Sequence, residues 1–156
     1  MAKRRKTARE KLEEAKGLPK IVMDTPKGAM LVPRPLDVDS LIRKVERGKL
    51  VTVDQIRERL ARDFRVDWTC PMTTGIFIRV AAEAAEEDLR EGRRQPSPYW
   101  RVIKTDGSLN EKFPGGTDHQ AARLIEEGHI IEPGKGKKPP RVKDFEKSLQ
   151  EIIVVP

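Results

Sequence analysis

The chain has 156 residues, of which 37% are charged and only 4% aromatic. This length fits one domain with a modest, mainly aliphatic core and leaves little room for a second. A single cysteine, Cys70, excludes an internal disulfide framework, and no apolar run reaches the roughly 18 residues of a transmembrane helix. We therefore expect a cytoplasmic protein with no membrane partner.

Positive charge is concentrated near the N-terminus. The formal net charge is +7. Residues 1–20 hold eight Lys or Arg against three Glu, a net +5, whereas the remaining residues hold 24 basic and 22 acidic side chains, a net +2. Clustered cations suit a polyanion, because each cation near a phosphate releases condensed counterions; a solvated tail is the alternative. The sequence thus divides into a basic N-terminal arm and linker, residues 1–35, and a domain, residues 36–156.

Within the arm and linker two local patterns stand out. Residues 3–17 predict a charged helix that ends at Gly17-Leu18-Pro19, since Gly and Pro do not continue a helix. Residues 20–35 carry three prolines between short apolar pieces, which predicts a linker with one or two edge strands.

A series of helices with clear end signals follows. Asp37 is a candidate N-cap for a helix closed by Gly48, and Thr52 with Gln55 has capping-box spacing for a second helix. The apolar residues expected on the buried faces of these two helices are Leu41, Ile42 and Val45, then Ile56, Leu60 and Phe64.

Pro71 is expected to begin a third helix that runs to about Gly92. On a helical wheel its apolar stripe consists of Thr73, Ile76, Phe77, Val80, Ala81 and Ala84. The opposite face consists of Gly75, Arg79, Ala82 and Glu86. Arg79 is therefore expected to project between two very small residues, as a helix that approaches a DNA minor groove requires. An ion pair of Arg79 with Glu83 or Glu86 is the alternative.

The rest of the chain alternates short strands with helices. Thr117 and Gln120 repeat the capping-box spacing ahead of a helix that Gly128 ends, and strands are expected at residues 99–103 and 129–131. A further helical face near the C-terminus is predicted from Phe145, Leu149 and Ile152. This order predicts a mostly α fold with short β strands, a winged helix-turn-helix module.

Several motifs resemble those of the methylated-DNA-protein cysteine methyltransferases. Pro98-Tyr99-Trp100-Arg101-Val102 is similar to the Pro-Cys-His-Arg-Val of that family's active-site strand, and Gly115-Gly116 and Glu127-Gly128-His129 follow in the family's order. Gly48-Lys49-Leu50-Val51-Thr52 is similar to the Gly-x-Val-x-Thr that precedes the first DNA-binding helix. Residues 37–131 thereby resemble the family's C-terminal DNA-binding domain.

The resemblance implies a site for double-stranded DNA. In this family the recognition helix enters the minor groove, an arginine replaces a flipped nucleotide, and the alkylated guanine turns into a pocket. The DNA-binding residues implied here are Thr73, Thr74, Gly75, Arg79, Lys49 and Arg101. The base pocket implied here consists of Pro98, Tyr99, Trp100, Arg101, Gly115, Gly116 and Glu127. Further cations available to phosphates are Arg57, Arg93, Arg94 and Lys104.

The two residues that perform the family's chemistry are replaced. Tyr99 stands in the position of the acceptor cysteine and Trp100 in that of its histidine, so the thiolate and its imidazole relay are both missing. The chain is in this respect similar to the alkyltransferase-like proteins, which bind alkylated bases without repairing them. We therefore expect a monomeric, non-enzymatic DNA-binding protein that recognises alkylated guanine, uses no cofactor, has no catalytic residues and engages a repair protein.

Two other functions stay open. Cys70, at the start of a helix, would be the relocated acceptor of an active DNA methyltransferase, or the chain would be a protein-interaction adaptor that kept the fold. His119 and His129 do not combine with Cys70 in a metal-ligand spacing, so no metal site is expected.

Overall fold

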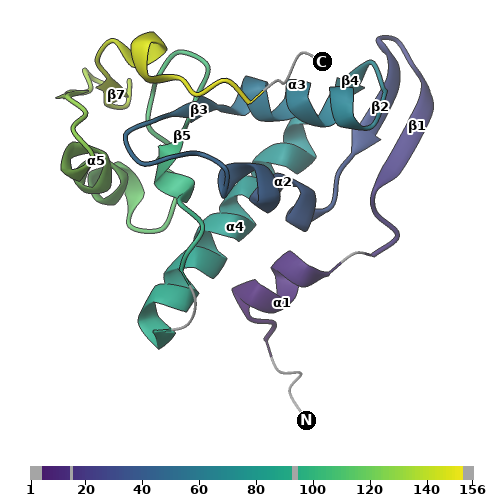
Figure 1. Ribbon diagram of the computed structural model, residues 1–156, viewed down its shortest axis with the longest axis horizontal. Coiled ribbons are helices and arrows are strands. Elements are labelled where there is room, and N and C mark those ends of the chain that lie inside the picture. The colour runs from purple at the N-terminus through teal and green to yellow at the C-terminus, as the bar shows by residue number, and fades with distance from the viewer. Residues whose placement is uncertain (1–4, 15, 93–94, 153–156) are drawn as a thin grey trace.

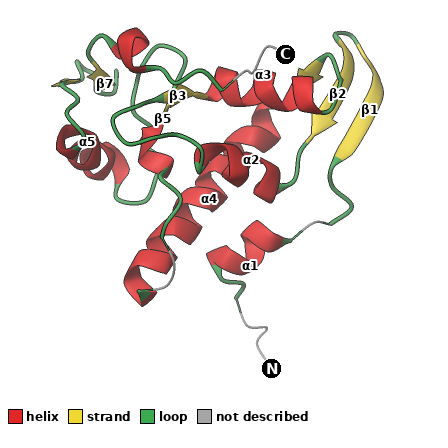
Figure 2. Cartoon of the chain, in the orientation of Figure 1, coloured by secondary structure: helices red, strands yellow, loops and turns green. Residues whose placement is uncertain are grey.

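The computed structural model describes residues 5–14, 16–92 and 95–152, and Figure 2 shows helices joined by loops and short strands. The α-helices are α1 (Ala8–Glu13), α2 (Pro35–Ile42), α3 (Val53–Asp63), α4 (Pro71–Glu91) and α5 (Gly116–Glu126). The strands are β1 (Lys20–Thr25), β2 (Gly28–Val32), β3 (Val51–Thr52), β4 (Trp68–Thr69), β5 (Val102–Ile103), β6 (Ile131–Glu132) and β7 (Arg141–Val142). The 3-10 helices are η1 (Tyr99–Arg101) and η2 (Phe145–Ser148). The predicted class, mostly helical with short strands, is confirmed.

Helix α4 runs diagonally through the molecule, and α1, α2 and α3 pack against it (Figure 1). The predicted bounds are confirmed: Pro71 is the first helical residue, and Gly92 ends the helix in the left-handed region at φ 61°. The side chains on its buried face are mostly small, which lets the neighbouring helices approach closely. These buried residues are Thr74, Ile78, Ala81, Ala82, Ala84, Ala85 and Asp88.

The predicted apolar stripe of α4 is wrong in phase. Ile76 is 43% exposed, whereas Ala82, placed on the open face by the wheel, is fully buried. Helices that precede α4 in the chain and η1, which follows it, all contact α4, and these contacts determine which face is buried. The sequence does not specify that face, because an alanine-rich helix has several faces of similar hydrophobicity. The second half of α4 is consequently buried on a wider arc than the first.

The two helices before α4 begin differently from one another. For α3 the predicted capping box is confirmed, since Gln55 N donates to Thr52 Oγ1 at 3.2 Å and Thr52 N donates to Gln55 Oε1 at 2.9 Å. For α2 the predicted N-cap, Asp37, is wrong. The helix begins at Pro35, and Asp37 lies in its first turn, where its carboxylate accepts from Arg34 N at 2.9 Å.

The strands form three small sheets. Strand β2 pairs antiparallel with β1 and parallel with β4. The β1–β2 hairpin, in the segment predicted to hold one or two edge strands, therefore packs beside the residues that directly precede α4. β3 pairs parallel with β5, and β6 pairs antiparallel with β7. The strand expected at residues 99–103 is confirmed only for its last two residues. Residues 99–101 form η1, because Tyr99 turns into the core directly after Pro98.

The C-terminal third corrects two further predictions. Thr117 and Gln120 form no capping box, because α5 begins at Gly116 and Gln120 is buried. Its amide donates to the carbonyl oxygens of Trp100 at 3.1 Å and Val102 at 3.0 Å. The helical face expected over residues 145–152 is only the short η2, after which Leu149 is extended and bridges to Leu50.

The N-terminal arm is packed where the structure describes it. α1 is capped by Thr7, and Ala8 and Leu12 are buried against α4, although the helix was expected over all of residues 3–17. Residues 3, 4 and 15 of that expectation lie outside the described residues. The division of the chain at residue 35 stays a prediction, but α1 shares its core with the domain.

Candidate nucleic-acid interface

The start of α4 presents an open surface beside the loop at residues 110–112. Met72 is 75% exposed, and a Cβ added at Gly75 would meet no atom within 4 Å. The surface is hollowed to a volume of about 350 Å³, which we call the α4 hollow. Its lining residues are Pro71, Met72, Gly75, Ile76, Arg79, Lys104, Asn110, Glu111 and Lys112. Sequence reasoning missed the exposed apolar pair Met72 and Ile76, which four-residue spacing on one turn of the helix signals.

Arg79 is half-buried at the edge of this hollow, and within the described residues it has no ion-pair partner. The alternative pairing with Glu86 does not form. The Glu86 carboxylate accepts from the Tyr99 hydroxyl at 2.6 Å and lies 2.9 Å from Nη2 of Arg123. Lys104 is only 3.6 Å from the exposed Glu111, a weak surface pair. The hollow therefore holds cations that protein carboxylates leave largely uncompensated.

The two neighbouring threonines of α4 are placed differently. Thr73 is half-buried near the hollow, and its hydroxyl donates to Cys70 Sγ at 3.2 Å. Thr74 is fully buried, and its hydroxyl donates to the Cys70 carbonyl oxygen at 2.7 Å. Thr74 is thus unavailable to a groove, which corrects its predicted contact with DNA.

The Cys70 thiol is half-buried at the N-terminal end of α4. Burial raises its pKa, but hydrogen bonds from the Thr73 hydroxyl and the backbone N–H groups of Thr73 and Met72 lower it by more, so the pKa lies below its ordinary value. Within the described residues no group of three or more His, Cys, Asp or Glu side chains is arranged to hold a metal ion. No described helix is long and apolar enough to span a bilayer.

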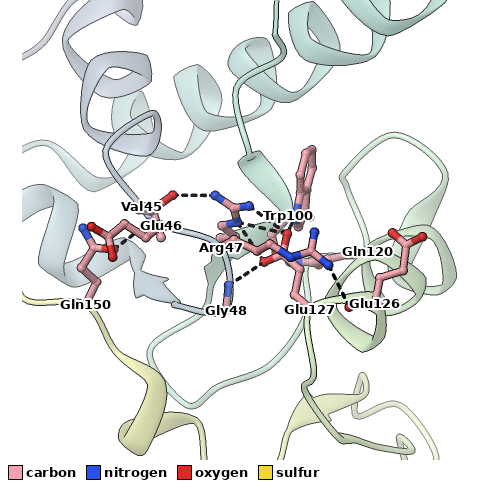
Figure 3. Close-up of polar contacts among 10 residues, drawn as sticks. Val45, Glu46, Arg47, Gly48, Trp100, Gln120, Glu126, Glu127 and Gln150 are labelled. Carbon is pink, nitrogen blue, oxygen red and sulfur yellow. Dashed lines mark hydrogen bonds and ion pairs between the residues drawn. The ribbon is translucent and has the colours of Figure 1, made fainter.

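A second set of predicted residues surrounds the carboxylate of Glu127 (Figure 3). Its Oε1 accepts from Gly48 N at 3.1 Å and from Arg101 Nε at 2.9 Å. Its Oε2 accepts from Trp100 Nε1 at 2.8 Å and from Arg101 Nη2 at 2.9 Å. We call Gly48, Trp100, Arg101 and Glu127 the Glu127 cluster. It ties the loop before β3 to η1 and to the end of α5.

The electrostatics of the Glu127 cluster are those of a closed ion pair. The Glu127 side chain is 3% exposed and that of Arg101 13%. Burial raises the pKa of Glu127, but the hydrogen bonds from Arg101, Trp100 and Gly48 N outweigh it and hold the pKa below its ordinary value. Arg101 also donates through Nη1 to the Val45 carbonyl oxygen at 2.6 Å. The Nε, Nη1 and Nη2 groups of Arg101 therefore donate to acceptors inside the protein, which corrects the predicted role of Arg101 as a phosphate contact.

Tyr99 is a core residue. It is fully buried, and its ring meets those of Trp100 and Phe113 edge-on, with centroids 5.4 and 5.1 Å apart. Burial, together with the hydrogen bond to Glu86, raises the pKa of its hydroxyl far above the ordinary value. Tyr99 thus does not line an open pocket, contrary to its predicted place.

Gly115 and Gly116 also serve the fold rather than a pocket wall. Gly115 has φ 79° at the N-terminal end of α5, and an added Cβ would lie 2.4 Å from the His119 ring. Lys49 is exposed but does not line the α4 hollow. Arg93 and Arg94, named as possible phosphate contacts, lie outside the described residues.

The remaining residues of the predicted base pocket line a different and larger depression of about 670 Å³. Pro98, Trp100, Arg101 and Glu127 all belong to it, and helix α4 contributes Leu89. Leu89 is ten residues beyond Arg79, or about 15 Å along the helix at 1.5 Å per residue. The structure therefore separates the predicted base pocket from the predicted DNA-contacting helix start, which sequence order alone could not reveal.

Comparison with known proteins yields only remote similarities. No protein-family model matches the chain, and no curated protein matches it either. Two crystal structures of S. pombe proteins have a similar chain course: Atl1 in complex with damaged DNA containing O6-carboxymethylguanine, and ATL in complex with DNA. Each is 18% identical over 74% of this chain and 93% of the other, with a TM-score of 0.49. Contacts and activity do not transfer at this level of similarity.

Proposed function

We propose that this protein binds double-stranded DNA without catalysing a reaction on it, and that the first three turns of α4 enter the minor groove. The observation that carries the proposal is Arg79, a cation without an ion-pair partner among the described residues, beside Gly75 and the α4 hollow. A residue without a side chain lets the helix backbone come close to a groove, and the guanidinium then reaches the base edges.

The surroundings of Arg79 fit the same role. Lys104 and Lys112 line the hollow and supply further positive charge for DNA phosphates. Met72 and Ile76 expose apolar side chains on the same helix turns, as in proteins that press apolar wedges against base steps. The acidic residues of α4 lie in its second half, so only the first half suits a polyanion.

We further propose that the α4 hollow, rather than the depression beside Trp100, receives an extruded base. Asn110 supplies an amide for a base edge, and Gly75 leaves room on the helix side. Alkylated guanine is the proposed lesion, because the motifs at residues 98–102, 115–116 and 127–129 resemble those of the methyltransferases. Under this proposal the protein acts in the cytoplasm as a monomer and marks the lesion for a repair protein.

The absence of alkyl transfer is proposed from the chemistry of three side chains. The Tyr99 phenol is buried and stays protonated, and the Trp100 indole is only a donor. The Glu127 carboxylate, which accepts at both oxygens inside the protein, has no capacity left to activate a nucleophile.

The alternative function is a DNA methyltransferase that uses Cys70 as the acceptor. It is considered because the pKa of the Cys70 thiol is lowered and its neighbours Pro71 and Met72 line the hollow. Transfer would move an alkyl group from guanine O6 to Sγ. Intact-mass measurement after incubation with a duplex containing O6-methylguanine decides this. We expect an unchanged mass, and a gain of one methylene unit would establish the methyltransferase instead.

The DNA proposal is tested by fluorescence anisotropy with two otherwise identical duplexes, one containing O6-methylguanine. We expect Arg79→Gln to weaken binding of both about tenfold, or about 1.4 kcal/mol, and to reduce the salt dependence by about one counterion. The matched control is Arg90→Gln, an exposed arginine at the other end of α4. Equal losses in the two variants would contradict the assignment of the DNA contact to the start of α4. Equal affinity of the wild type for both duplexes would remove lesion recognition and leave DNA binding.

A further inference from the structure

We propose that the depression beside Trp100 is a second, independent binding site, for a small organic phosphate with a planar ring, of mononucleotide size. We call it the arginine pocket. Guanidinium groups reach it from three parts of the chain: Arg43 and Arg47 follow α2, Arg101 ends η1, and Arg123 belongs to α5. Its volume of about 670 Å³ lies within the range of small-molecule sites, roughly 300–1,000 Å³.

The hydrogen-bond donors of these arginines are only partly used. Among the described residues, the Arg47 guanidinium donates only from Nη2, to the Glu126 carbonyl oxygen at 3.2 Å (Figure 3). Arg43 uses Nε for Asp39 and Nη1 for the Gln95 carbonyl oxygen, which leaves Nη2 without a partner among the described residues. A guanidinium carries five N–H donors, so Arg43 and Arg47 both retain donors for an anion.

Arg123 is oriented toward the same pocket by two contacts. Its Nη2 lies 2.9 Å from a carboxylate oxygen of Glu86, and its guanidinium carbon lies 4.6 Å from the centre of the Trp100 ring. The Trp100 ring is itself fixed, because its Nε1 donates to Glu127. The pocket therefore has a rigid planar wall with a cation stacked on it, next to free guanidinium donors.

The apolar part of the lining favours a ligand with a ring rather than a bare anion. Leu89 is 43% exposed, and Pro96 and Pro98 add two further apolar surfaces. A phosphate alone would leave this apolar lining in water, whereas an attached planar ring would cover it. A mononucleotide combines both groups.

The negative charges nearby favour a small anion over a nucleic-acid strand. Glu127 is neutralised by Arg101, but Glu126 is exposed and lines the pocket. The Glu126 carboxylate would repel a continuous phosphate backbone, while a single phosphate between Arg43 and Arg47 avoids it. The arginine pocket also shares no lining residue with the α4 hollow, so the inference does not rest on the proposed DNA binding.

The test follows the two indole N–H signals in ¹⁵N-labelled full-length protein during titration with deoxyguanosine 5′-monophosphate. The Trp100 signal should move saturably with a Kd below about 1 mM. The Trp68 signal should not move, because its Nε1 donates to Thr25 outside the pocket. Deoxyguanosine and inorganic phosphate, each carrying half of the ligand, should bind at least about tenfold more weakly.

Two variants complete the test. Arg47→Gln removes an exposed side chain with one backbone contact, and it should weaken the mononucleotide about tenfold. Lys44→Gln is the matched control, since Lys44 is exposed in the same loop but does not line the pocket. No saturable movement of Trp100 with the mononucleotide, or equal weakening by both variants, would overturn the proposal. Inorganic phosphate binding as tightly as the mononucleotide would overturn the ring-binding part. Arg79→Gln should leave this titration unchanged, which separates it from the DNA experiment.

Discussion

The start of α4 and the Glu127 cluster contain the same kinds of residue, arginine, glycine and an apolar side chain, but they use them in opposite ways. At the start of α4, Arg79 has no ion-pair partner among the described residues and Gly75 faces open space. In the Glu127 cluster, Arg101 donates to Glu127 and Val45, and Gly48 N donates to the same carboxylate. Polar groups already satisfied within the protein stabilise the fold, and only unsatisfied ones at a surface are free for a partner.

The comparison explains why the motif at residues 98–102 is a poor guide to the proposed DNA-binding surface at the start of α4. Trp100 donates its indole N–H to the buried Glu127 carboxylate. Tyr99 lies in the core, where its hydroxyl donates to Glu86. These contacts engage the polar groups of residues 99–101 within the fold.

The largest difference between the regions should appear in stability. Glu127→Ala removes one member of a buried ion pair and leaves Trp100 Nε1 and two nitrogens of Arg101, Nε and Nη2, without their acceptor, so we expect a loss of about 3–5 kcal/mol. Arg79→Ala should change stability by less than about 0.5 kcal/mol. Urea denaturation at neutral pH measures both, and similar losses for the two variants would break the comparison.

The pH dependence of stability should come from the Glu127 cluster rather than from the start of α4. The pKa of Glu127 in the folded protein lies below its ordinary value of 4.5, so the unfolded chain binds a proton more readily. The stabilisation is complete above that value and is lost as the pH falls below it, at up to about 1.4 kcal/mol per pH unit for one group.

Glu127→Gln should reduce this dependence, as measured by urea midpoints at a series of pH values. Asp106, whose pKa is also lowered by its hydrogen bonds with Ser108, should supply part of what remains. A variant with the full acid dependence of the wild type would show that Glu127 is not the group that titrates.

Within the first half of α4, the two threonines provide a finer test. Thr74→Val removes a buried hydroxyl that donates to the Cys70 carbonyl oxygen, and we expect it to cost about 1 kcal/mol of stability without altering DNA affinity. Thr73→Val should leave stability almost unchanged and raise the pKa of Cys70, since it deletes the hydrogen bond to Sγ. Thiol reaction rates as a function of pH measure the second effect.

Gly75→Ala should have the smallest effect, with a gain in stability and a loss in DNA affinity. Gly75→Ala adds a methyl group where no atom lies within 4 Å, in the interior of a helix, so we expect a gain of about 0.5–1 kcal/mol in stability. The same methyl group would hold the helix away from the groove and weaken DNA binding. Gains in both assays would place the DNA contact elsewhere.

The sequence predicted the start of α3 and both ends of α4 well because their signals are local. The Thr52–Gln55 capping box and the Pro71 and Gly92 ends depend on residues within one turn of the helix terminus. The equally spaced Thr117 and Gln120 failed because Gln120 is recruited by carbonyl oxygens of residues 100 and 102, a tertiary contact that overrides the cap.

The site was harder to predict, since its arrangement depends on pairs far apart in sequence. Glu86 and Tyr99, or Gly48 and Glu127, meet only after the chain has folded. Nothing in the local sequence distinguishes Arg79, which has no ion-pair partner in the described part of the chain, from Arg101, which pairs with Glu127. Met72 and Ile76 are exposed although apolar side chains are usually buried, and exposed apolar residues are expected where a surface binds a partner.

The short α1 has a dynamic consequence. Its six residues are too few for a stable isolated helix, and its first amides are held instead by the Glu87 carboxylate, with Ala8 N and Arg9 N donating at 2.8 and 3.1 Å. Amide hydrogen exchange in α1 should therefore report undocking, a local opening that leaves α4 protected. The N-terminal segment and the helix that we assign to DNA would then exchange with solvent on separate timescales, as two cooperative units within one core.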